Sequence, residues 1–329
     1  MSDANVAPTQ KTVVRIGTRG SELATTQAGH VRDALIALGQ QAELVVFKTE
    51  GDANRKDPVE KIGIGVFTQA LRHALREDQC DIVVHSFKDL PTVPEPDLMV
   101  AAVPEREDAR EVLISRGKVA LKDLPEGAKI GTSAPRRVSQ LKSLRPDLNI
   151  QPLRGNIDTR MNRVNDDLDA VILARAGLSR TGRLDRATET LATDTLMPAP
   201  AQGALAVECR KADADIVALL AKINDDATHA HCVAERAVLF ELQAGCTAPV
   251  AAHAVAVEDG GFELTAGVYA LDGSRKLVES ARLSASESAA TSAVDSVENR
   301  YQAAHELGVA LARRLKDAGA HEIMGDTLR

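Results

Sequence analysis

The first two-thirds of the chain alternate short β-branched apolar runs with amphipathic helical patterns, and this alternation restricts the possible fold more than any other feature. Strand-like runs lie at 12–17, 44–48, 81–86 and 98–103. A helix pattern covers 67–77, and an earlier one places on a single face Gln27, Val31, Leu35 and Leu38. This βαβ rhythm predicts an α/β fold with an open, mostly parallel sheet.

The same rhythm restarts near residue 110 and predicts a second lobe. Its strand-like runs lie at 111–115, 129–131 and 169–174, and a helix pattern covers 138–144. A further strand at 205–209 and a helix at 216–223 follow the Pro-rich connector 197–203. We expect this last strand and helix to return to the first domain.

Past residue 226 the pattern changes to a small α+β domain. A helix at 231–242 is followed by the alternating segments 251–258, 262–270 and 275–283, which are typical of an antiparallel meander, and by a long helix at 293–318. We therefore expect four parts. They are a disordered leader (1–10), a first domain (11–104 with 204–223), a second domain (110–197) and a third domain (226–329).

Composition excludes several classes of partner. The formal net charge of −7 and an aromatic content of 2% argue against a nucleic-acid surface, which needs a basic field or stacking side chains. Residues 1–10 lack the apolar core of a secretory signal, and no apolar run approaches the roughly 20 residues of a membrane span. Four cysteines without a CxxC pair are typical of reduced thiols in a cytoplasmic protein.

Two strand-to-helix junctions resemble each other, 15–21 (RIGTRGS) and 129–137 (KIGTSAPRR). A helix N-terminus attracts anions through free backbone N–H groups and the positive end of its dipole. The side chains that we expect at such sites are Thr18, Arg19 and Ser21 in the first junction and Thr132, Ser133, Arg136 and Arg137 in the second. The alternative is a helix N-cap followed by a solvated basic turn.

Further arginines follow predicted strands, where ligands bind in open α/β sheets. They are Arg154 and Arg160 in 153–160, and Arg175 and Arg180 in 174–182. Guanidinium groups bind carboxylates in bidentate fashion. In an acidic chain, arginines gathered at strand ends predict a small polyanionic ligand, although Arg175 could simply be solvated.

The segment 85–91 (HSFKDLP) places Lys88 and Asp89 directly after a buried strand. A carboxylate at the mouth of a cleft can transfer a proton or stabilise a nearby cation, so Asp89 is a candidate catalytic residue. The alternative is a common Asp–Lys turn. His85 fits a hydrogen-bonded core or hinge position better than a base.

Cys246 lies on a small-residue loop, 241–249 (ELQAGCTAP), where a thiol is easy to reach. Cys80 and Cys209 accompany apolar strands and are predicted to be buried and inert. His229, His231 and Cys232 do not have the spacing of zinc ligands, so no metal site is predicted.

Seven segments, in order, resemble the porphobilinogen deaminase (hydroxymethylbilane synthase) family, from about residue 13 to the final helix. They are IGTRGS, HSFKDLP, REDARE (106–111), GTSAPRR, LRGNIDTR, PAQGALAVEC and AGCTAP. The resemblance implies two lobes like those of periplasmic binding proteins and a third domain that carries the cysteine. It implies a dipyrromethane cofactor attached to Cys246 through a thioether. It also implies that four porphobilinogen molecules are joined head to tail, with loss of ammonia, to give hydroxymethylbilane.

The resemblance also assigns residues. Asp89 would be catalytic: it would protonate the leaving amine, stabilise the electron-poor azafulvene and help remove the ring proton. The residues implied to hold the cofactor are Cys246, Ser86, Lys88, Thr132, Ser133, Arg136, Arg137 and Gly155. Those implied to bind porphobilinogen and the growing chain are Arg19, Ser21, Lys61, Phe67, Arg154, Arg160, Arg180 and Gln202. The family favours a monomer.

Three departures from the family pattern affect expected contacts. Ala134 replaces a usual Ser, 61–67 (KIGIGVF) replaces a Gly-rich stretch with an inner Lys, and Glu50 stands where some relatives have Arg. The family places 50–65 in a mobile lid. Two other functions stay open: a non-catalytic two-lobed binding protein for an organic polyanion, and a regulatory effector domain.

Overall fold

The computed structural model describes residues 12–47, 66–245, 248–285 and 295–325. The predicted leader and the predicted lid lie outside these residues. The chain divides into two compact units. The first consists of Met1–His85, Pro94–Pro104 and Leu205–Asn224, and the second of Ser86–Val93, Glu105–Ala204 and Asp225–Arg329.

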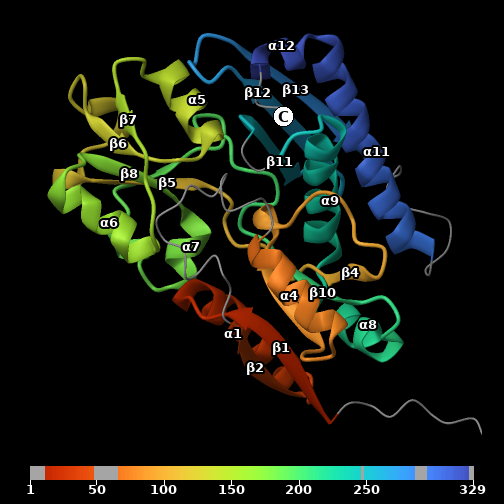
Figure 1. The fold of residues 1–329 in the computed structure, drawn as a ribbon. Coiled ribbons are helices and arrows are strands. Elements are labelled where there is room, and N and C mark those ends of the chain that lie inside the picture. The colour runs from red at the N-terminus through yellow and green to blue at the C-terminus, as the bar shows by residue number, and fades with distance from the viewer. Residues whose placement is uncertain (1–11, 48–65, 246–247, 286–294, 326–329) are drawn as a thin grey trace, which may run out of the picture. The chain divides into compact units, whose positions relative to one another are not determined.

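The first unit is built on a five-stranded sheet with the order β2-β1-β3-β10-β4 (Figure 1). Its strands are β1 Val13–Arg19, β2 Gln41–Phe47, β3 Ile82–Ser86, β4 Leu98–Ala102 and β10 Leu205–Arg210. β1 runs parallel to β2 and β3, whereas β10 runs antiparallel to β4. The predicted return of the 205–209 strand to the first sheet is confirmed.

The helices of the first unit are α1 Glu22–Ala37, α4 Val66–Arg76 and α8 Ala214–Leu220. In α1 the predicted apolar face is buried at Gln27, Val31 and Leu35. Leu38 is 48% exposed, so the prediction that it shares this face of the helix was wrong. The helix ends at Ala37 and Leu38 is the C-cap, so Leu38 does not continue the buried face of the helix.

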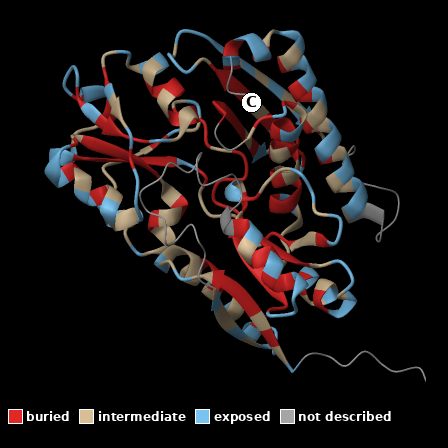
Figure 2. Ribbon diagram, viewed as in Figure 1, coloured by how far each residue is buried: buried red, intermediate tan, exposed pale blue. Residues whose placement is uncertain are grey.

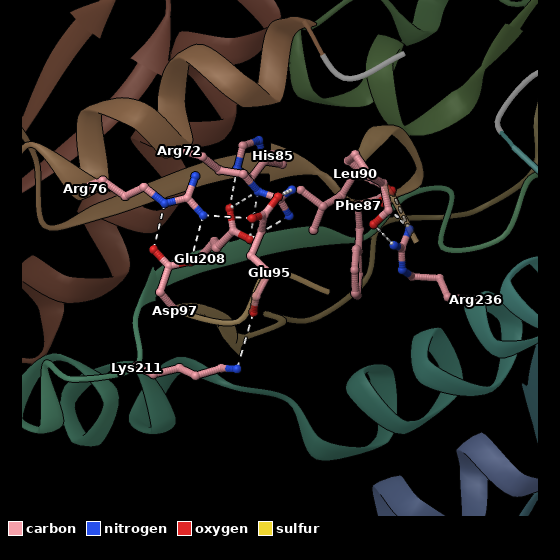
Figure 3. A network of polar contacts seen from close by, with 11 residues as sticks. Arg72, Arg76, His85, Phe87, Leu90, Glu95, Asp97, Glu208, Lys211 and Arg236 are labelled. Atoms are coloured by element: carbon pink, nitrogen blue, oxygen red, sulfur yellow. Dashed lines mark hydrogen bonds and ion pairs between the residues drawn. The ribbon is translucent and has the colours of Figure 1, made fainter. Parts of the chain in front are cut away.

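Three buried polar side chains tie α4 to the sheet of the first unit (Figure 3). The Arg72 guanidinium donates to both carboxylate oxygens of Glu208 on β10, from Nε at 3.0 Å and from Nη2 at 2.8 Å. The His85 Nε2 lies 3.4 Å from the same carboxylate. His85 is buried, so the core position expected for it is confirmed, but its Nε2 has no hydrogen-bond partner among the described residues.

The second unit contains a five-stranded sheet with the order β7-β6-β8-β5-β9. Its strands are β5 Glu111–Ser115, β6 Lys129–Gly131, β7 Asn149–Gln151, β8 Ala170–Ala174 and β9 Glu189–Leu191. The associated helices are α5 Pro135–Leu144, α6 Ile157–Asp166 and α7 Arg175–Arg180. β6 is parallel to β7 and β8, and β5 is antiparallel to β8 and β9. Both five-stranded sheets are therefore mixed.

The two five-stranded sheets share one topology. In each, the strand that carries an Ile-Gly-Thr sequence lies between the next two strands of the chain. Ile16 of β1 pairs with Ile82, and Ile130 of β6 pairs with Ala170, so these strands hold equivalent registers. The resemblance between 15–21 and 129–137 thus reflects a repeated strand-to-helix unit.

The second unit also contains the predicted antiparallel meander, with the order β11-β12-β13. Its elements are β11 Val250–Ala256, β12 Phe262–Tyr269, β13 Lys276–Leu283, α9 Asp226–Glu241, α11 Asp295–Asp317 and α12 Ala320–Met324. α9 and α11 pack together and against this sheet. Figure 2 shows buried and exposed positions alternating along α11, as expected for a helix that covers a core. In the described ranges, no helix combines the length and apolar character needed to span a bilayer.

Candidate active site

A cavity of about 240 Å³ lies in the second unit. Its walls come from the 3₁₀ turn Phe87–Asp89, the start of α5, the middle of α6, the 199–202 loop and the residues on either side of 246–247. The charged residues that line it are Lys88, Asp89, Arg136, Arg137 and Arg160. Segments far apart in sequence thus bring many of the predicted site residues together.

Asp89 and Lys88 enter the cavity from a turn that is fixed by its neighbours. Phe87 and Leu90 are buried, whereas Asp89 is exposed. The Lys88 Nζ donates to Oε1 of Gln202 at 3.2 Å. Burial lowers the pKa of Lys88, and the nearby Asp89 carboxylate opposes this shift. The turn therefore presents an exposed carboxylate and a partly buried amine on adjacent residues.

Glu111 binds both arginines at the start of α5. It accepts from Arg137 Nε at 2.9 Å and Nη2 at 2.8 Å, and from Arg136 Nη2 at 2.5 Å. Burial alone would raise the pKa of Glu111, but Arg137 and Arg136 outweigh it and lower the pKa to about 2. Because two guanidinium groups share one carboxylate, this cluster retains one excess positive charge toward the cavity.

Arg160 of α6 adds a cation whose hydrogen bonding is incomplete. Its Nε is buried without a hydrogen-bond partner. Burial lowers the pKa of Arg160, the Arg137 charge lowers it further, and Asp89 opposes both. A buried donor without an acceptor costs about 1–3 kcal/mol. An anionic group in the cavity would supply the missing acceptor.

The residues just before α5 bring two side chains with hydroxyl groups, Thr132 and Ser133, to the cavity wall. Thr132 is buried, and Ser133 accepts from Leu153 N at 2.8 Å and donates to Leu153 O at 3.0 Å. Ala134 is the N-cap and makes no side-chain capping bond. The replacement of the family's Ser by Ala134 therefore removes a hydroxyl from the cavity wall itself.

Of four further predicted residues in the second unit, Gln202 lines the cavity, whereas Arg154, Gly155 and Arg180 are not among its lining residues. Gln202 is buried in the cavity wall, and its Nε2 donates to Ala109 O at 2.7 Å. Arg180 donates to Gly203 O at 2.7 Å, and burial lowers its pKa to about 10. Arg154 is exposed at the turn before α6. Gly155 has a φ of +100°, which favours glycine, and a Cβ there would lie 2.7 Å from Thr159 Cγ2.

The predicted residues of the first unit lie at the end of β1 and the start of α1. Arg19 is the last residue of β1. Ser21 is the N-cap of α1, where its Oγ accepts from Ala24 N at 3.4 Å. The N-cap alternative therefore describes Ser21. Phe67 belongs to α4, and Lys61 lies outside the described residues.

Cys246 also lies outside the described residues, but its neighbours Gly245 and Ala248 line the cavity. Cys80, Cys209 and Cys232 are buried free thiols. Burial raises the pKa of Cys80 to about 11 and the pKa values of Cys209 and Cys232 to about 12. The prediction that Cys80 and Cys209 are buried is confirmed.

No cluster of three metal-ligating side chains occurs among the described residues. His229, one of the candidates considered from sequence, instead stacks on Tyr301, with ring centroids 4.3 Å apart. Its burial lowers its pKa to about 4.

Three important residues were not assigned a role from sequence: Glu111, Glu235 and Arg236. Glu111 begins a buried strand, and a lone Glu at that position could have suggested a buried ion pair. Glu235 and Arg236 occupy the middle of α9, where nothing in the local pattern distinguishes a long-range partner from a solvated charge. Glu235 is buried and accepts from Arg106 Nη1 at 2.7 Å.

Comparison with known proteins gives consistent matches along the chain. A family model described as “Porphobilinogen deaminase, dipyromethane cofactor binding domain” matches residues 14–218, and “Porphobilinogen deaminase, C-terminal domain” matches residues 229–317. The chain is 61% identical over 272 residues to a porphobilinogen deaminase of Corynebacterium efficiens, covering 82% of this chain and 90% of that protein.

A second relative matches over a longer stretch. The chain is 54% identical over 316 residues to a porphobilinogen deaminase of Corynebacterium glutamicum, covering 95% of this chain and 99% of that protein. Among solved structures, the methionine-binding protein MetQ aligns at 12% identity with a TM-score of 0.42, covering 69% of this chain and 94% of that one.

Proposed function

This chain belongs to the porphobilinogen deaminase family, and we propose which of its residues carry the steps of that family's reaction. The reaction joins four porphobilinogen molecules head to tail, releases ammonia and yields hydroxymethylbilane for tetrapyrrole synthesis. The observation that carries the assignment is one cavity that gathers Asp89, Lys88, three arginines and the residues flanking Cys246.

The family's dipyrromethane cofactor fits this cavity chemically. Its acetate and propionate groups are anionic, and the cavity offers an excess of cations together with the unpartnered Nε of Arg160. Dipyrromethane, when bound, supplies the primer from which the chain grows. We assign its attachment to Cys246, because Gly245 and Ala248, which flank residues 246–247 in the sequence, line the cavity. Its carboxylates would be held by the side chains of Lys88, Arg136, Arg137, Thr132 and Ser133. Ser86 and Gly155 would shape the turns nearby.

Asp89 is assigned the proton transfers. Its carboxylate is exposed in the cavity and lies within electrostatic reach of Lys88 and Arg160. In this role it protonates the amine that leaves porphobilinogen, stabilises the electron-poor carbon that results, and helps to remove the ring proton after coupling. Lys88 Nζ donates to Gln202 Oε1, which holds the ammonium beside the Asp89 turn.

The remaining arginines are assigned to the substrate and the growing chain. Each pyrrole ring carries two carboxylates, so a lengthening product needs several cationic contacts, each worth about 1.5–3 kcal/mol. Arg160 lies in the cavity, and Arg180 and Arg154 lie on the helices and turns of the same unit. Arg19, Ser21, Phe67 and Lys61 stay proposals from the family resemblance, and so does Gln202 as a substrate contact.

The domain division and the setting of the protein are proposals as well. We propose three domains, 11–104 with 204–223, 110–197 and 226–329, and a protein that acts as a monomer without nucleic acid. A cytoplasmic location is supported by the free thiols of Cys80, Cys209 and Cys232.

Intact-protein mass and turnover test the assignment together. Wild-type protein should be heavier than its polypeptide by one dipyrromethane, and Cys246→Ser should lose both the added mass and the activity. Asp89→Asn should keep the added mass and nearly abolish turnover. A non-catalytic binding protein would instead carry no adduct, form no bilane and retain its function after Asp89→Asn.

A further inference from the structure

The backbone of the Asp89 turn is held by a side chain from α9. Arg236 Nη1 donates to Phe87 O at 3.0 Å and to Leu90 O at 3.0 Å, and Nη2 donates to Pro91 O at 2.7 Å (Figure 3). The guanidinium carbon also lies 4.6 Å from the centroid of the Phe87 ring. One guanidinium therefore bonds the chain on both sides of Asp89 without contacting its carboxylate through any of these bonds.

The segment that Arg236 contacts belongs to a different unit from the chain on either side of it. Residues Ser86–Val93 pack within the second unit, whereas the chain before and after them, Met1–His85 and Pro94–Pro104, packs within the first. Two further bonds shape the turn, from Phe87 N to Ala204 O at 3.1 Å and from Leu90 N to Phe87 O at 3.2 Å. Asp89 thus owes its position in the cavity to contacts that the second unit makes with a short excursion of the chain.

The helix that carries Arg236 also leads to the loop assigned to the cofactor. α9 spans Asp226–Glu241, the next residue Leu242 is buried, and Gly245 lines the cavity. A helix packed on both α11 and the meander is a rigid support. The Asp89 turn and residues 242–245, which precede Cys246, therefore both adjoin the same helix.

We propose that Arg236 is a positioning residue, which holds the Asp89 turn, and with it the Asp89 carboxylate, at the cavity that Gly245 also lines. This inference rests on the proposed roles of Asp89 and Cys246. A guanidinium suits the task because its planar fork reaches several carbonyls at once and stacks on an aromatic face. A lysine ammonium is a compact point charge on a flexible stem, so it cannot reproduce both features.

The test compares two arginines that make the same kind of contact. Arg145 also donates to three backbone carbonyls, those of Leu121, Lys122 and Leu124. It pairs with Asp147 as well, and it does not line the cavity. Arg236→Met and Arg145→Met should both lower the melting temperature of the loaded enzyme. Only Arg236→Met should lower kcat, by roughly 10- to 100-fold, because small displacements of a catalytic group have effects of that size.

Two other readouts separate positioning from general destabilisation. The KM for porphobilinogen and the mass of the attached cofactor should stay close to wild type in Arg236→Met, because the cationic side chains of the cavity remain. Arg236→Lys should recover part of kcat. It also serves as the measured variant if Arg236→Met does not accumulate.

A double-variant cycle shows whether Arg236 acts through Asp89. On an Asp89→Glu background, where the carboxylate is already displaced, Arg236→Met should cost much less than in the wild-type chain. If the two losses multiply, or if Arg236→Met and Arg145→Met have the same kcat, the positioning role is wrong. If Asp89→Asn itself keeps full turnover, the fault lies instead in the proposed role of Asp89.

Discussion

Glu111 holds the Arg137 guanidinium through two parallel hydrogen bonds, from Nε to Oε1 at 2.9 Å and from Nη2 to Oε2 at 2.8 Å. Its Oε1 also accepts from Arg136 at 2.5 Å. Two arginines proposed to hold the cofactor are thus already partnered by a protein carboxylate. Glu111 stabilises them before any ligand arrives, and the excess charge of the cluster remains for a ligand carboxylate.

Glu111→Gln should strongly destabilise the protein. The substitution leaves two buried guanidinium groups without an opposing charge, and breaking a buried ion pair from one side costs about 3–5 kcal/mol. The free energy of unfolding, measured in urea, gives the loss. Glu189→Gln is the matched control, since Glu189 accepts a single bond from Leu121 N at 2.8 Å in the same sheet. Equal losses in the two variants would contradict the role of Glu111.

Stability should fall in acid because of two buried carboxylates. Partners lower the pKa of Glu111 and the pKa of Glu235 to about 2, whereas an unfolded Glu has a pKa near 4.5. A lowered folded-state pKa adds stability that is complete above pH 4.5 or so and is lost as the pH falls toward 2. Urea unfolding between pH 7 and pH 3 should show this decline.

Glu235→Gln should make the acid decline shallower while lowering stability at neutral pH. The carboxylate accepts from Arg106 Nη1, Ala201 N and Ala254 N, so its loss leaves several buried donors with weaker partners. An unchanged slope of stability against pH would show that Glu235 does not carry this dependence.

Arg160→Met should separate binding from stability. The substitution removes a buried Nε that has no hydrogen-bond partner, so unfolding free energy should stay within about 1 kcal/mol of wild type or rise. The KM for porphobilinogen should rise, by roughly tenfold for a lost charge-assisted contact of about 1.5 kcal/mol. A large stability loss with unchanged KM would mean that Arg160 is structural.

Gly155→Ala should disturb the turn before α6. The residue has a φ of +100°, and an added Cβ would meet Thr159 at 2.7 Å. Backbone strain of this kind costs about 1–3 kcal/mol. Gly182→Ala provides a control, because Gly182 has a φ of +67° with nothing near its Cβ position. We expect Gly155→Ala to lower both the melting temperature and cofactor loading more than the control does.

Alkylation with iodoacetamide should distinguish the four cysteines. Cys80, Cys209 and Cys232 are buried and have pKa values raised to about 11 or 12. Their thiolate fraction at neutral pH is roughly a hundredfold or more below that of a thiol with a pKa near 8.5. Loaded enzyme should therefore resist labelling, and protein made without cofactor should be labelled at Cys246. Rapid labelling of a buried cysteine would contradict this order of reactivity.

The sequence predicted the parts of the fold that repeat or that bury a long apolar face. β1 and β6 could be identified because each combines a buried run with a Gly-Thr ending before a helix. β7 and β9 span only three residues each, too short for an alternating pattern, and α6 buries only Met161 and Val164. Such elements are stabilised by tertiary packing and leave little local signal.

The candidate site was predictable in its residue types and less so in their partners. Arginine at a helix start predicts an anion, but the sequence could not show that Glu111, 25 positions before Arg136, would supply one. In the same way, Arg236 lies 149 positions from Phe87, and the helix pattern around Arg236 does not predict that contact. Long-range polar partners depend on the assembled fold, which local periodicity does not encode.

The position of β10 between β3 and β4 has a consequence for synthesis on the ribosome. β4 is an edge strand whose neighbour in the sheet is β10, and β10 is synthesised about a hundred residues after β4. A domain can finish folding only when all of its strands have been synthesised. The five-stranded sheet of the second unit, by contrast, is encoded entirely within residues 111–191. During synthesis, β4 therefore lacks its partner β10 until the strands of residues 111–191 have been made.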